Sequence, residues 1–174
     1  MEIIARIYTA PEKKNIRYPF CMMPAILFLF AVVLTACEQG PRDIRMGEQE
    51  CAHCRMMISD ERFAAQLVTE QGRQYAFDAV ECLAAYVKDG DGQDLDIAGK
   101  WVPDFNRVGE WLVAGEAIYL QSDELRSPMA LNFSAYAGRR DAQERQDEFG
   151  GDVLDWQELK QIVHREWSGG QYQH

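Results

Sequence analysis

The feature that most limits how this 174-residue chain can fold is an apolar run near its N-terminus. Residues 24–36, with the sequence PAILFLFAVVLTA, follow a region that carries Lys13, Lys14 and Arg17. A helix needs about 20 apolar residues to span a bilayer, and this run is shorter, with the length of the apolar part of an export signal. We therefore predict that residues 1–36 are a signal peptide and not part of the folded protein.

The end of the apolar run also predicts a lipid anchor. The sequence LTAC, residues 34–37, resembles the lipobox that bacterial lipoprotein signal peptidase cleaves, so Cys37 would become the lipidated first residue. The alternative is a plain signal anchor with an incidental cysteine. We expect a periplasmic protein that is lipid-anchored to a membrane. Glu38 favours the outer membrane over the inner one, because it is not the aspartate associated with inner-membrane retention.

The 138 residues that remain are enough for one domain, or for two small halves that share a core. The signal holds four basic and two acidic side chains, so this part carries a net charge of −12 against −10 for the whole chain. This charge argues against nucleic acid and against a polybasic membrane patch. We predict a flexible tether over residues 37–50, a folded domain over residues 51–167 and a disordered tail over residues 168–174.

Strand-like and helical patterns alternate through the folded domain. Two apolar runs that flank Gln71 and Gly72 predict a β-hairpin, and a helical pattern with Asp78 as its cap follows until Gly90. The second half is expected to hold strands, a charged helix, a short strand and a last helix capped by Asp155. This order predicts an α+β fold of two similar ββαβ-type halves packed together.

The stretch CAHCRMM, residues 51–57, concentrates sulfur-containing side chains. Thiols tend to pair in an oxidising compartment, but Cys51, Cys54 and Cys82 are odd in number. A disulfide between Cys51 and Cys54, redox-active or structural, is one interpretation, although the following residues lack the helical spacing typical of a thioredoxin-like site. Zinc is another, but a closed zinc site usually takes its ligands as two pairs, and no second pair is present.

The methionines of this stretch favour a softer metal. Thiolate and thioether sulfur together select Cu(I) over zinc and the hard divalent ions. Cys54 and Met56 are two positions apart, so in an extended segment both sulfurs would lie on the same face. Met57 would point the other way, where core packing is the simpler role. The pattern therefore predicts Cys54 and Met56 as one edge of a Cu(I) site.

The stretches CAHCRMMISDERFAAQL and GRQYAFDAVECLAAYV resemble the opening of the NosL family, the copper-binding accessory lipoproteins of bacterial nitrous-oxide reductase. The similarity continues through WVPDF, WLVAGEAIYLQSDELRSPMALNFSAYA and FGGDVLDWQEL, almost to the end of the chain. It implies a monomeric periplasmic chaperone, not an enzyme, that binds Cu(I) and delivers it for assembly of the reductase's copper-sulfide centre through an ABC-type membrane maturation complex. It also implies two ββαβ halves, similar to a domain of organomercurial lyase.

The resemblance further implies a ligand set. The Cys-x-Met of the family falls on Cys54 and Met56, and the methionine of its SPM sequence falls on Met129. Met129 is the expected third ligand, because a methionine that follows proline at the start of a strand, here residues 129–137, has a restricted backbone. His53 is the second choice.

Two cysteines have open roles beside this set. Cys51 could bind the metal or shield it. Cys82 stands where members of the family commonly have an apolar residue, and we expect it to be a small buried hydrophobic side chain rather than a ligand. Ala130 also departs from the family, which often has glycine at this position.

Two other classes of function stay open at this stage. One is an enzyme that uses the Cys51 and Cys54 pair, either as a thiol-disulfide oxidoreductase or as an organomercurial lyase with Asp78 as its acid. The other is a structural lipoprotein with a Cys51 to Cys54 disulfide and no metal. Similarity of fold does not by itself decide among these functions.

Overall fold

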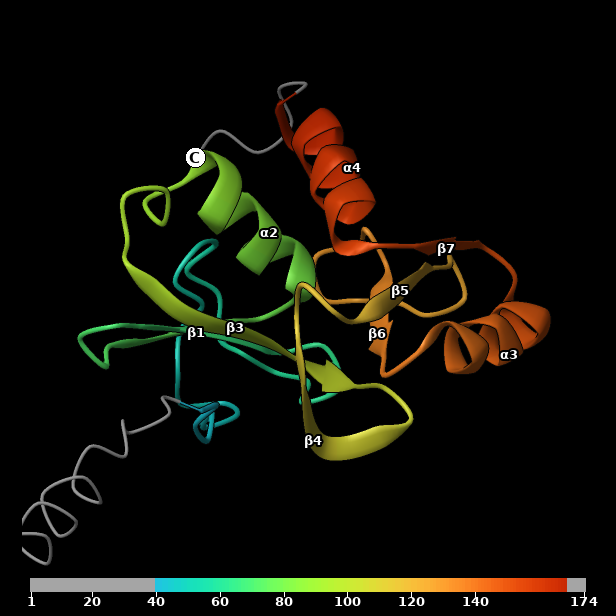
Figure 1. Cartoon of the computed structure of the whole chain (residues 1–174), viewed down its shortest axis with the longest axis horizontal. Helices are drawn as coiled ribbons and strands as arrows, with labels where there is room; N and C mark the ends of the chain where they lie inside the picture. The colour runs from blue at the N-terminus through green and yellow to red at the C-terminus, as the bar shows by residue number, and fades with distance from the viewer. Residues whose placement is uncertain (1–39, 169–174) are drawn as a thin grey trace, which may run out of the picture. The chain divides into compact units, whose positions relative to one another are not determined.

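Seven strands and three helices make up residues 40–168, the part of the chain that the structure, a computed structural model, describes (Figure 1). The strands form two antiparallel sheets, one of four strands and one of three. The predicted signal peptide, Cys37 and residues 169–174 lie outside the described residues. Within residues 40–168, none of the helices has the length and apolar character needed to cross a membrane.

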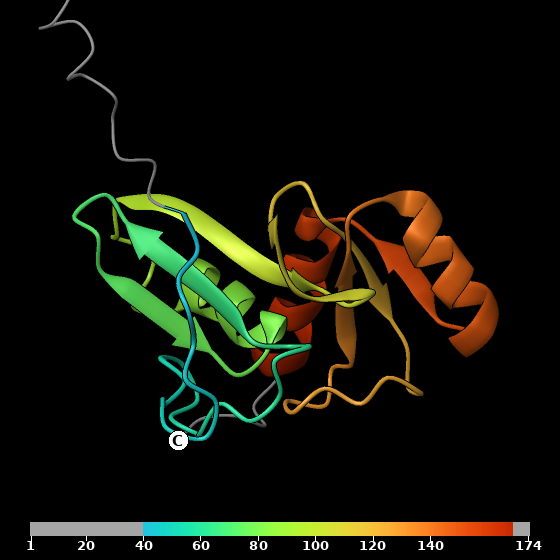
Figure 2. The same ribbon diagram turned by 90° about the horizontal axis from the view of Figure 1, so that it is seen from below.

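The first sheet has the strand order β2-β1-β3-β4. Its strands are β1 (Ala65–Thr69), β2 (Gln74–Phe77), β3 (Ile97–Asp104) and β4 (Arg107–Val113). The central strand β1 is buried along its whole length. The hairpin predicted at Gly72 is confirmed, because Gly72 has a φ of 81° and its N–H donates to the Thr69 carbonyl at 2.8 Å. Helix α2 (Val80–Asp89) then lies across one face of the sheet (Figures 1 and 2).

The second sheet has the strand order β6-β5-β7. Its elements are β5 (Ile118–Gln121), β6 (Phe133–Tyr136), α3 (Arg139–Phe149) and β7 (Asp152–Leu154), and α4 (Trp156–Ser168) follows. In each sheet the first strand is central, its hairpin partner lies on one side and the strand that follows the helix lies on the other. The expected α+β class is confirmed, and the element order ββαβ occurs in both sheets.

Backbone and helix contacts join the two sheets. The N–H of Phe105, just after β3, donates to the Ala135 carbonyl in β6 at 2.9 Å. Helices α2 and α4 lie side by side in Figure 1, and His164 Nδ1 of α4 is 2.8 Å from Asp89 Oδ2 of α2. The main hydrophobic cluster draws on both halves, since it includes Leu67, Leu83, Tyr119 and Leu159, all fully buried. One core therefore serves both sheets.

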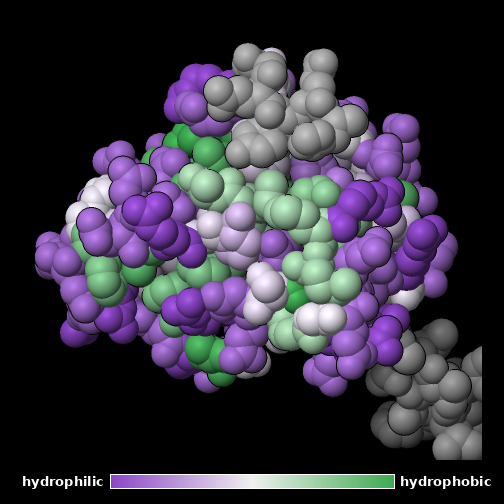
Figure 3. All heavy atoms as spheres, turned by 180° about the vertical axis from the view of Figure 1, so that it is seen from behind, coloured by the Kyte–Doolittle hydropathy of each residue, from purple (hydrophilic) through white to green (hydrophobic). Residues whose placement is uncertain are grey.

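The surface is mainly polar. The face seen in Figure 3 carries an interrupted band of hydrophobic side chains between polar groups. Among the described residues, the large hydrophobic side chains that are exposed are Met56, Met57, Val108 and Val113. Two of these four belong to the cysteine-rich stretch, so sulfur is presented to solvent there.

Only one of the two predicted helix caps is present. The Asp155 carboxylate accepts hydrogen bonds from the backbone N–H groups of Gln157 at 2.8 Å and Glu158 at 2.9 Å, which confirms it as the cap of α4. The prediction for Asp78 is wrong, because Ala79 is the N-cap of α2 and makes no side-chain cap hydrogen bond. The Asp78 carboxylate instead accepts the N–H of Ser59 at 2.9 Å. A buried carboxylate must be hydrogen-bonded, and here Ser59 provides that bond.

The cap of α4 supports a stability prediction. Asp155→Ala is expected to lower the free energy of unfolding by about 1 kcal/mol, because two backbone N–H groups lose their acceptor. Chemical denaturation of Asp155→Ala and of Asp147→Ala, an exposed position on α3, measures the difference. Equal losses in the two variants would contradict a capping role for Asp155.

The predicted strand over residues 129–137 is too long. Only Phe133–Tyr136 pair as β6, and Met129 lies in a turn before that strand. Ala130 and Asn132 have positive φ values of 63° and 62°, which no regular strand contains. The alternation of apolar residues that suggested a strand therefore comes partly from a turn.

The predicted tether is also shorter than expected. The backbone N–H of Arg42 donates to Gln66 Oε1 at 2.9 Å, and Gln66 Nε2 donates to the Arg42 carbonyl at 2.8 Å. The Ile58 N–H donates to the Gln49 carbonyl at 2.9 Å. Because the fully buried amide of Gln66 needs polar partners, the chain is already held against the domain at Arg42.

Candidate metal-binding site

The cysteine-rich stretch forms a closed turn and not an extended strand. The N–H of Arg55 donates to the Cys51 carbonyl at 3.1 Å, and the N–H of Cys51 donates to the Met56 carbonyl at 2.8 Å. Arg55 has a positive φ of 64°, which reverses the chain directly after Cys54. The argument that Cys54 and Met56 share one face of a strand is therefore wrong, although both residues remain neighbours in the turn.

Helix α2 brings a third sulfur to this turn. Cys82 lies in the first turn of α2, and the Sγ atoms of Cys51, Cys54 and Cys82 all lie within 4.8 Å of one another. All three are free thiols. The expectation that Cys82 is buried is confirmed, but it lies against the other two sulfurs and not only among hydrocarbon side chains.

The three thiols differ in their access to solvent. Cys51 and Cys82 are fully buried, whereas Cys54 is only half-buried. Met56 follows two residues later and is 46% exposed. The cluster therefore has a closed inner side and one open side, which is formed by Cys54 and lies beside Met56 in the turn.

Contacts within the cluster separate the pKa values of the thiols. Hydrogen bonds from Cys54 and then Cys82 hold the pKa of Cys51 well below its ordinary value despite burial, and the backbone amides of Asp78 and Cys54 add to this effect. The pKa values of Cys54 and Cys82 are raised, chiefly because each faces the Cys51 sulfur. These shifts favour Cys51 as the first of the three sulfurs to lose its proton, and binding of a metal by the thiols releases protons.

Met129 lies in a turn that is attached to the same helix. The Ser127 hydroxyl donates a hydrogen bond to Glu81 Oε1, one residue before Cys82. The N–H of Asn132 donates to Ser127 Oγ at 3.0 Å, which closes the turn around Met129. Met129 is 7% exposed and belongs to the same hydrophobic cluster as Cys51 and Cys82.

His53 has a different partner. Its ring stacks on Trp167 near the end of α4, with the ring centroids 5.6 Å apart and the planes 4° from parallel. Burial lowers the pKa of His53 and so favours the neutral imidazole. Among the described residues, the group of close potential ligands contains the three cysteines and does not include His53.

The sequence did not predict that Cys82 lies beside Cys51 and Cys54. The odd number of thiols was a signal, but a cysteine 28 positions after Cys54 can join the turn only if α2 begins beside it. Three sulfurs that converge from a turn and a helix make a site for a soft metal ion, because thiolates prefer Cu(I), zinc and other thiophilic ions to hard cations. A closed structural zinc site would need a fourth ligand.

An α+β domain with a partly open cluster of three thiols that could hold a metal ion defines the class of candidate thiol-containing metal-binding proteins. Within this class the chain belongs to the NosL family, whose family model matches residues 44–163. The fold is similar to the crystal structure of the copper chaperone NosL from Shewanella denitrificans, with a TM-score of 0.58 and 16% sequence identity over 71% of this chain and 99% of that chain. Comparison with curated proteins found no match.

Proposed function

We propose that this protein is a periplasmic Cu(I) chaperone that delivers copper for assembly of the copper-sulfide centre of nitrous-oxide reductase. The observation that carries the proposal is the convergence of three thiol sulfurs within 4.8 Å in a member of the NosL family. The similar crystal structure is that of a copper chaperone, which supports the same function. The proposed role is binding and transfer of Cu(I), not catalysis.

Cys54 is the central ligand in this proposal. Cys51 and Cys82 complete a set of three soft sulfur ligands, and their burial protects the bound ion from water. Thiolate sulfur favours Cu(I), and a site with three ligands leaves room for an incoming ligand from a partner. Transfer then proceeds by ligand exchange from the half-buried side of Cys54.

The methionines extend the same site. Met56 is exposed two residues after Cys54, and its proposed role is to take the ion as it enters or leaves. Met129 is buried, and the Ser127 to Glu81 hydrogen bond attaches its turn next to Cys82 on α2. Met56 and Met129 therefore remain the proposed thioether ligands of an alternative three-sulfur set with Cys54. His53, which is stacked on Trp167, acts as a support for the turn.

Membrane attachment and partners complete the proposal. Cys37 is the proposed lipidation site after removal of residues 1–36. A lipid anchor, with the outer membrane favoured, holds the domain in the periplasm. The proposed partners are the reductase itself and an ABC-type membrane maturation complex. Deletion of the gene should lower the copper content of the purified reductase, and restored expression should return it.

Anaerobic competition titration tests the binding step. The reduced mature protein is expected to take one Cu(I) per chain from a chromogenic Cu(I) chelator. Copper-edge X-ray absorption should then report sulfur ligands only, because all proposed ligands are thiolates or thioethers. Absence of tight Cu(I) uptake would end this proposal. Insulin reduction or methylmercury cleavage that is lost in Cys54→Ser would favour the enzymatic alternatives instead.

The role of Met56 has a matched control in its neighbour. Met56 and Met57 are each 46% exposed, so Met56→Leu and Met57→Leu remove equal thioethers from equally accessible positions. Met56→Leu is expected to slow Cu(I) transfer to a chelator by about tenfold, an effect typical of groups that assist a metal ligand. Stopped-flow transfer assays with both variants measure this rate. Equal rates for the two variants would remove Met56 from the transfer path.

A further inference from the structure

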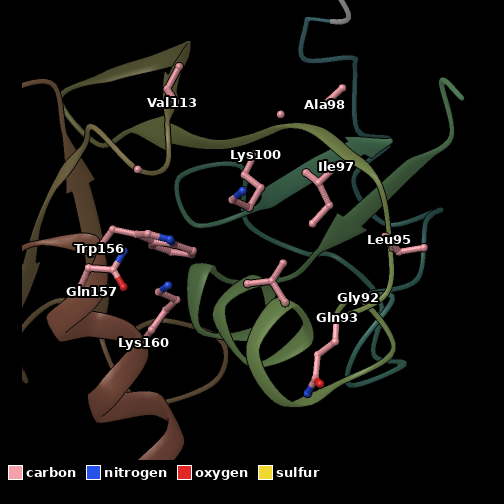
Figure 4. A pocket seen from close by; sticks show the side chains of 13 residues that line it. Gly92, Gln93, Leu95, Ile97, Ala98, Lys100, Val113, Trp156, Gln157 and Lys160 are labelled. Atoms are coloured by element: carbon pink, nitrogen blue, oxygen red, sulfur yellow. The ribbon is translucent and has the colours of Figure 1, made fainter. Parts of the chain in front are cut away.

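A cleft on another side of α2 is lined by Lys100 and Lys160, two of the three lysines in residues 40–168. The cleft has a volume of about 520 Å³ and lies between β3, the end of α2 and α4. Figure 4 shows Lys100 from β3 and Lys160 from α4 directed toward the same hollow, with the Trp156 ring between them. Lys88 of α2 lies close enough that, with Lys100, it lowers the pKa of Lys160, although burial has the larger effect. Residues 40–168 contain no other lysine.

None of the three lysines forms a close ion pair with a carboxylate of the described residues. Within residues 40–168, the close ion pairs between basic and acidic side chains involve arginines and His164 and none of the lysines. The whole chain has a net charge of −10, and Asp94 and Asp96 stand next to lining residues in the sequence, although neither is itself a lining residue. Lys100 and Lys160 line the cleft from separate elements without a close carboxylate partner among the described residues, so they make a local positive field on an anionic protein.

Apolar side chains line the same cleft. Val87, Leu95 and Ile97 form part of its wall, and Trp156 is 5% exposed. The Lys160 Nζ atom lies 5.8 Å from the centre of the Trp156 ring, which holds the charge over an aromatic face. The cleft therefore offers an apolar surface bordered by positive charge.

One edge of β3 is open at the cleft. β4 pairs with β3 only from Trp101 onward, whereas Ile97 and Gly99 pair with β1 on the other side. Residues 97–99 line the cleft, and no described strand pairs with them there. An unpaired strand edge offers backbone N–H and C=O groups to an added strand.

We propose that this cleft is a docking site for an extended acidic peptide segment of a partner protein. The peptide adds as a strand along residues 97–99, its carboxylates pair with Lys100 and Lys160, and an apolar side chain packs on Trp156. Charge complementarity favours this occupant, because a long polyanion such as nucleic acid would be repelled by the acidic remainder of the surface. The inference goes beyond the proposed function and does not depend on copper.

The loop between α2 and β3 places this cleft near the candidate metal-binding site. Gly92 and Leu95 line the lysine cleft, while Asp91 lines a separate hollow together with Ala52 and Arg55 of the cysteine-rich turn. A segment bound in the cleft therefore lies one loop away from Cys54.

Fluorescence anisotropy with the mature protein tests the docking site. The probe is a short labelled peptide that alternates glutamate with valine. It is expected to bind the protein, and its affinity should fall as salt is added. The double variant Lys100→Glu, Lys160→Glu should weaken binding at least about tenfold, since two ion pairs become repulsions. Arg126→Glu with Arg139→Glu is the matched control, because it changes the net charge equally at two exposed sites.

Three further measurements distinguish what binds in the cleft. A backbone-methylated form of the peptide should bind weakly, because it cannot add as a strand. Equal binding of this form, or full displacement of the probe by inorganic phosphate at low millimolar concentration, would show an anion site only and would overturn the proposal. Equal weakening in both double variants would overturn it as well. The Cu(I) stoichiometry of the lysine variant should match that of the unmodified protein, which separates this test from the test of copper binding.

Discussion

Cys54→Ser is expected to lower the Cu(I) affinity of the protein by more than about 100-fold. Loss of a group that only supports a metal ligand commonly costs about 10- to 100-fold, and a ligand itself should cost more. Cys54 lies within 4.8 Å of both other sulfurs and is the only half-buried one of the three, so its loss removes both a ligand and the open side of the site. Competition with a Cu(I) chelator under anaerobic conditions measures the change.

Cys82→Ala decides which ligand set is used. The substitution is small and apolar, so it suits a fully buried position in α2. If three thiolates bind the ion, Cys82→Ala should lose Cu(I) affinity to an extent similar to that of Cys54→Ser. The number of short copper-sulfur distances in the X-ray absorption spectrum should then fall. Unchanged affinity and an unchanged spectrum would favour Cys54, Met56 and Met129 as the whole ligand set. Met57→Leu serves as the control that removes sulfur from the same turn.

Glu81 is expected to make stability depend on pH. This carboxyl is fully buried in α2, and burial raises its pKa from 4.5 to about 7. The Ser127 hydroxyl donates to Oε1, while Oε2 has no hydrogen-bond partner. The unfolded chain releases the proton at a lower pH than the folded chain does, so stability is full below about pH 4.5 and falls as the pH rises through about 7.

The expected size of this effect is about 3 kcal/mol, since one pKa unit corresponds to about 1.4 kcal/mol. Denaturation of the metal-free protein and of Glu81→Gln at several pH values measures it. The difference in unfolding free energy between the two proteins should change by about this amount, in favour of the variant, between pH 4 and pH 8. An unsatisfied amide in Glu81→Gln changes the unfolding free energy by the same amount at every pH. It therefore does not affect how the difference between the two proteins changes with pH.

An exposed carboxylate provides the control for Glu81. Glu124→Gln changes the same chemical group at an exposed position in the loop after β5. It should leave the pH dependence of stability close to that of the unmodified protein. A Glu81→Gln profile that parallels the unmodified protein over the whole range would mean that Glu81 is already ionised in the fold.

Local patterns predicted much of the fold. The hairpin at Gly72, the end of α2 at Gly90 and the cap at Asp155 depend on residues that are close in sequence, and all three are confirmed. The helix cap at Asp78 and the strand over residues 129–137 were predicted wrongly. Asp78 contacts Ser59, which is distant in sequence, instead of capping α2. The residues before β6 form a turn around Ser127 instead of a longer strand. In both cases a specific contact overrode the local preference.

The candidate metal-binding site shows the same contrast between local features that could be predicted and those that could not. Cys51 and Cys54 are neighbours in sequence, so their proximity could be predicted, whereas the turn at Arg55 reverses the chain and removes the shared strand face expected for Cys54 and Met56. The positive φ of Arg55 could not be predicted, because arginine has no preference for that conformation.

The sequence by itself determined the chemistry that this protein has available. It supplies soft sulfur ligands in a short stretch, the NosL pattern along most of the chain and an α+β order of elements. Tertiary structure alone decided that Cys82 joins Cys51 and Cys54, and that Lys100 and Lys160 line one cleft. Residues this far apart meet only when helices pack on sheets over a common core, and local sequence patterns carry no information about that packing.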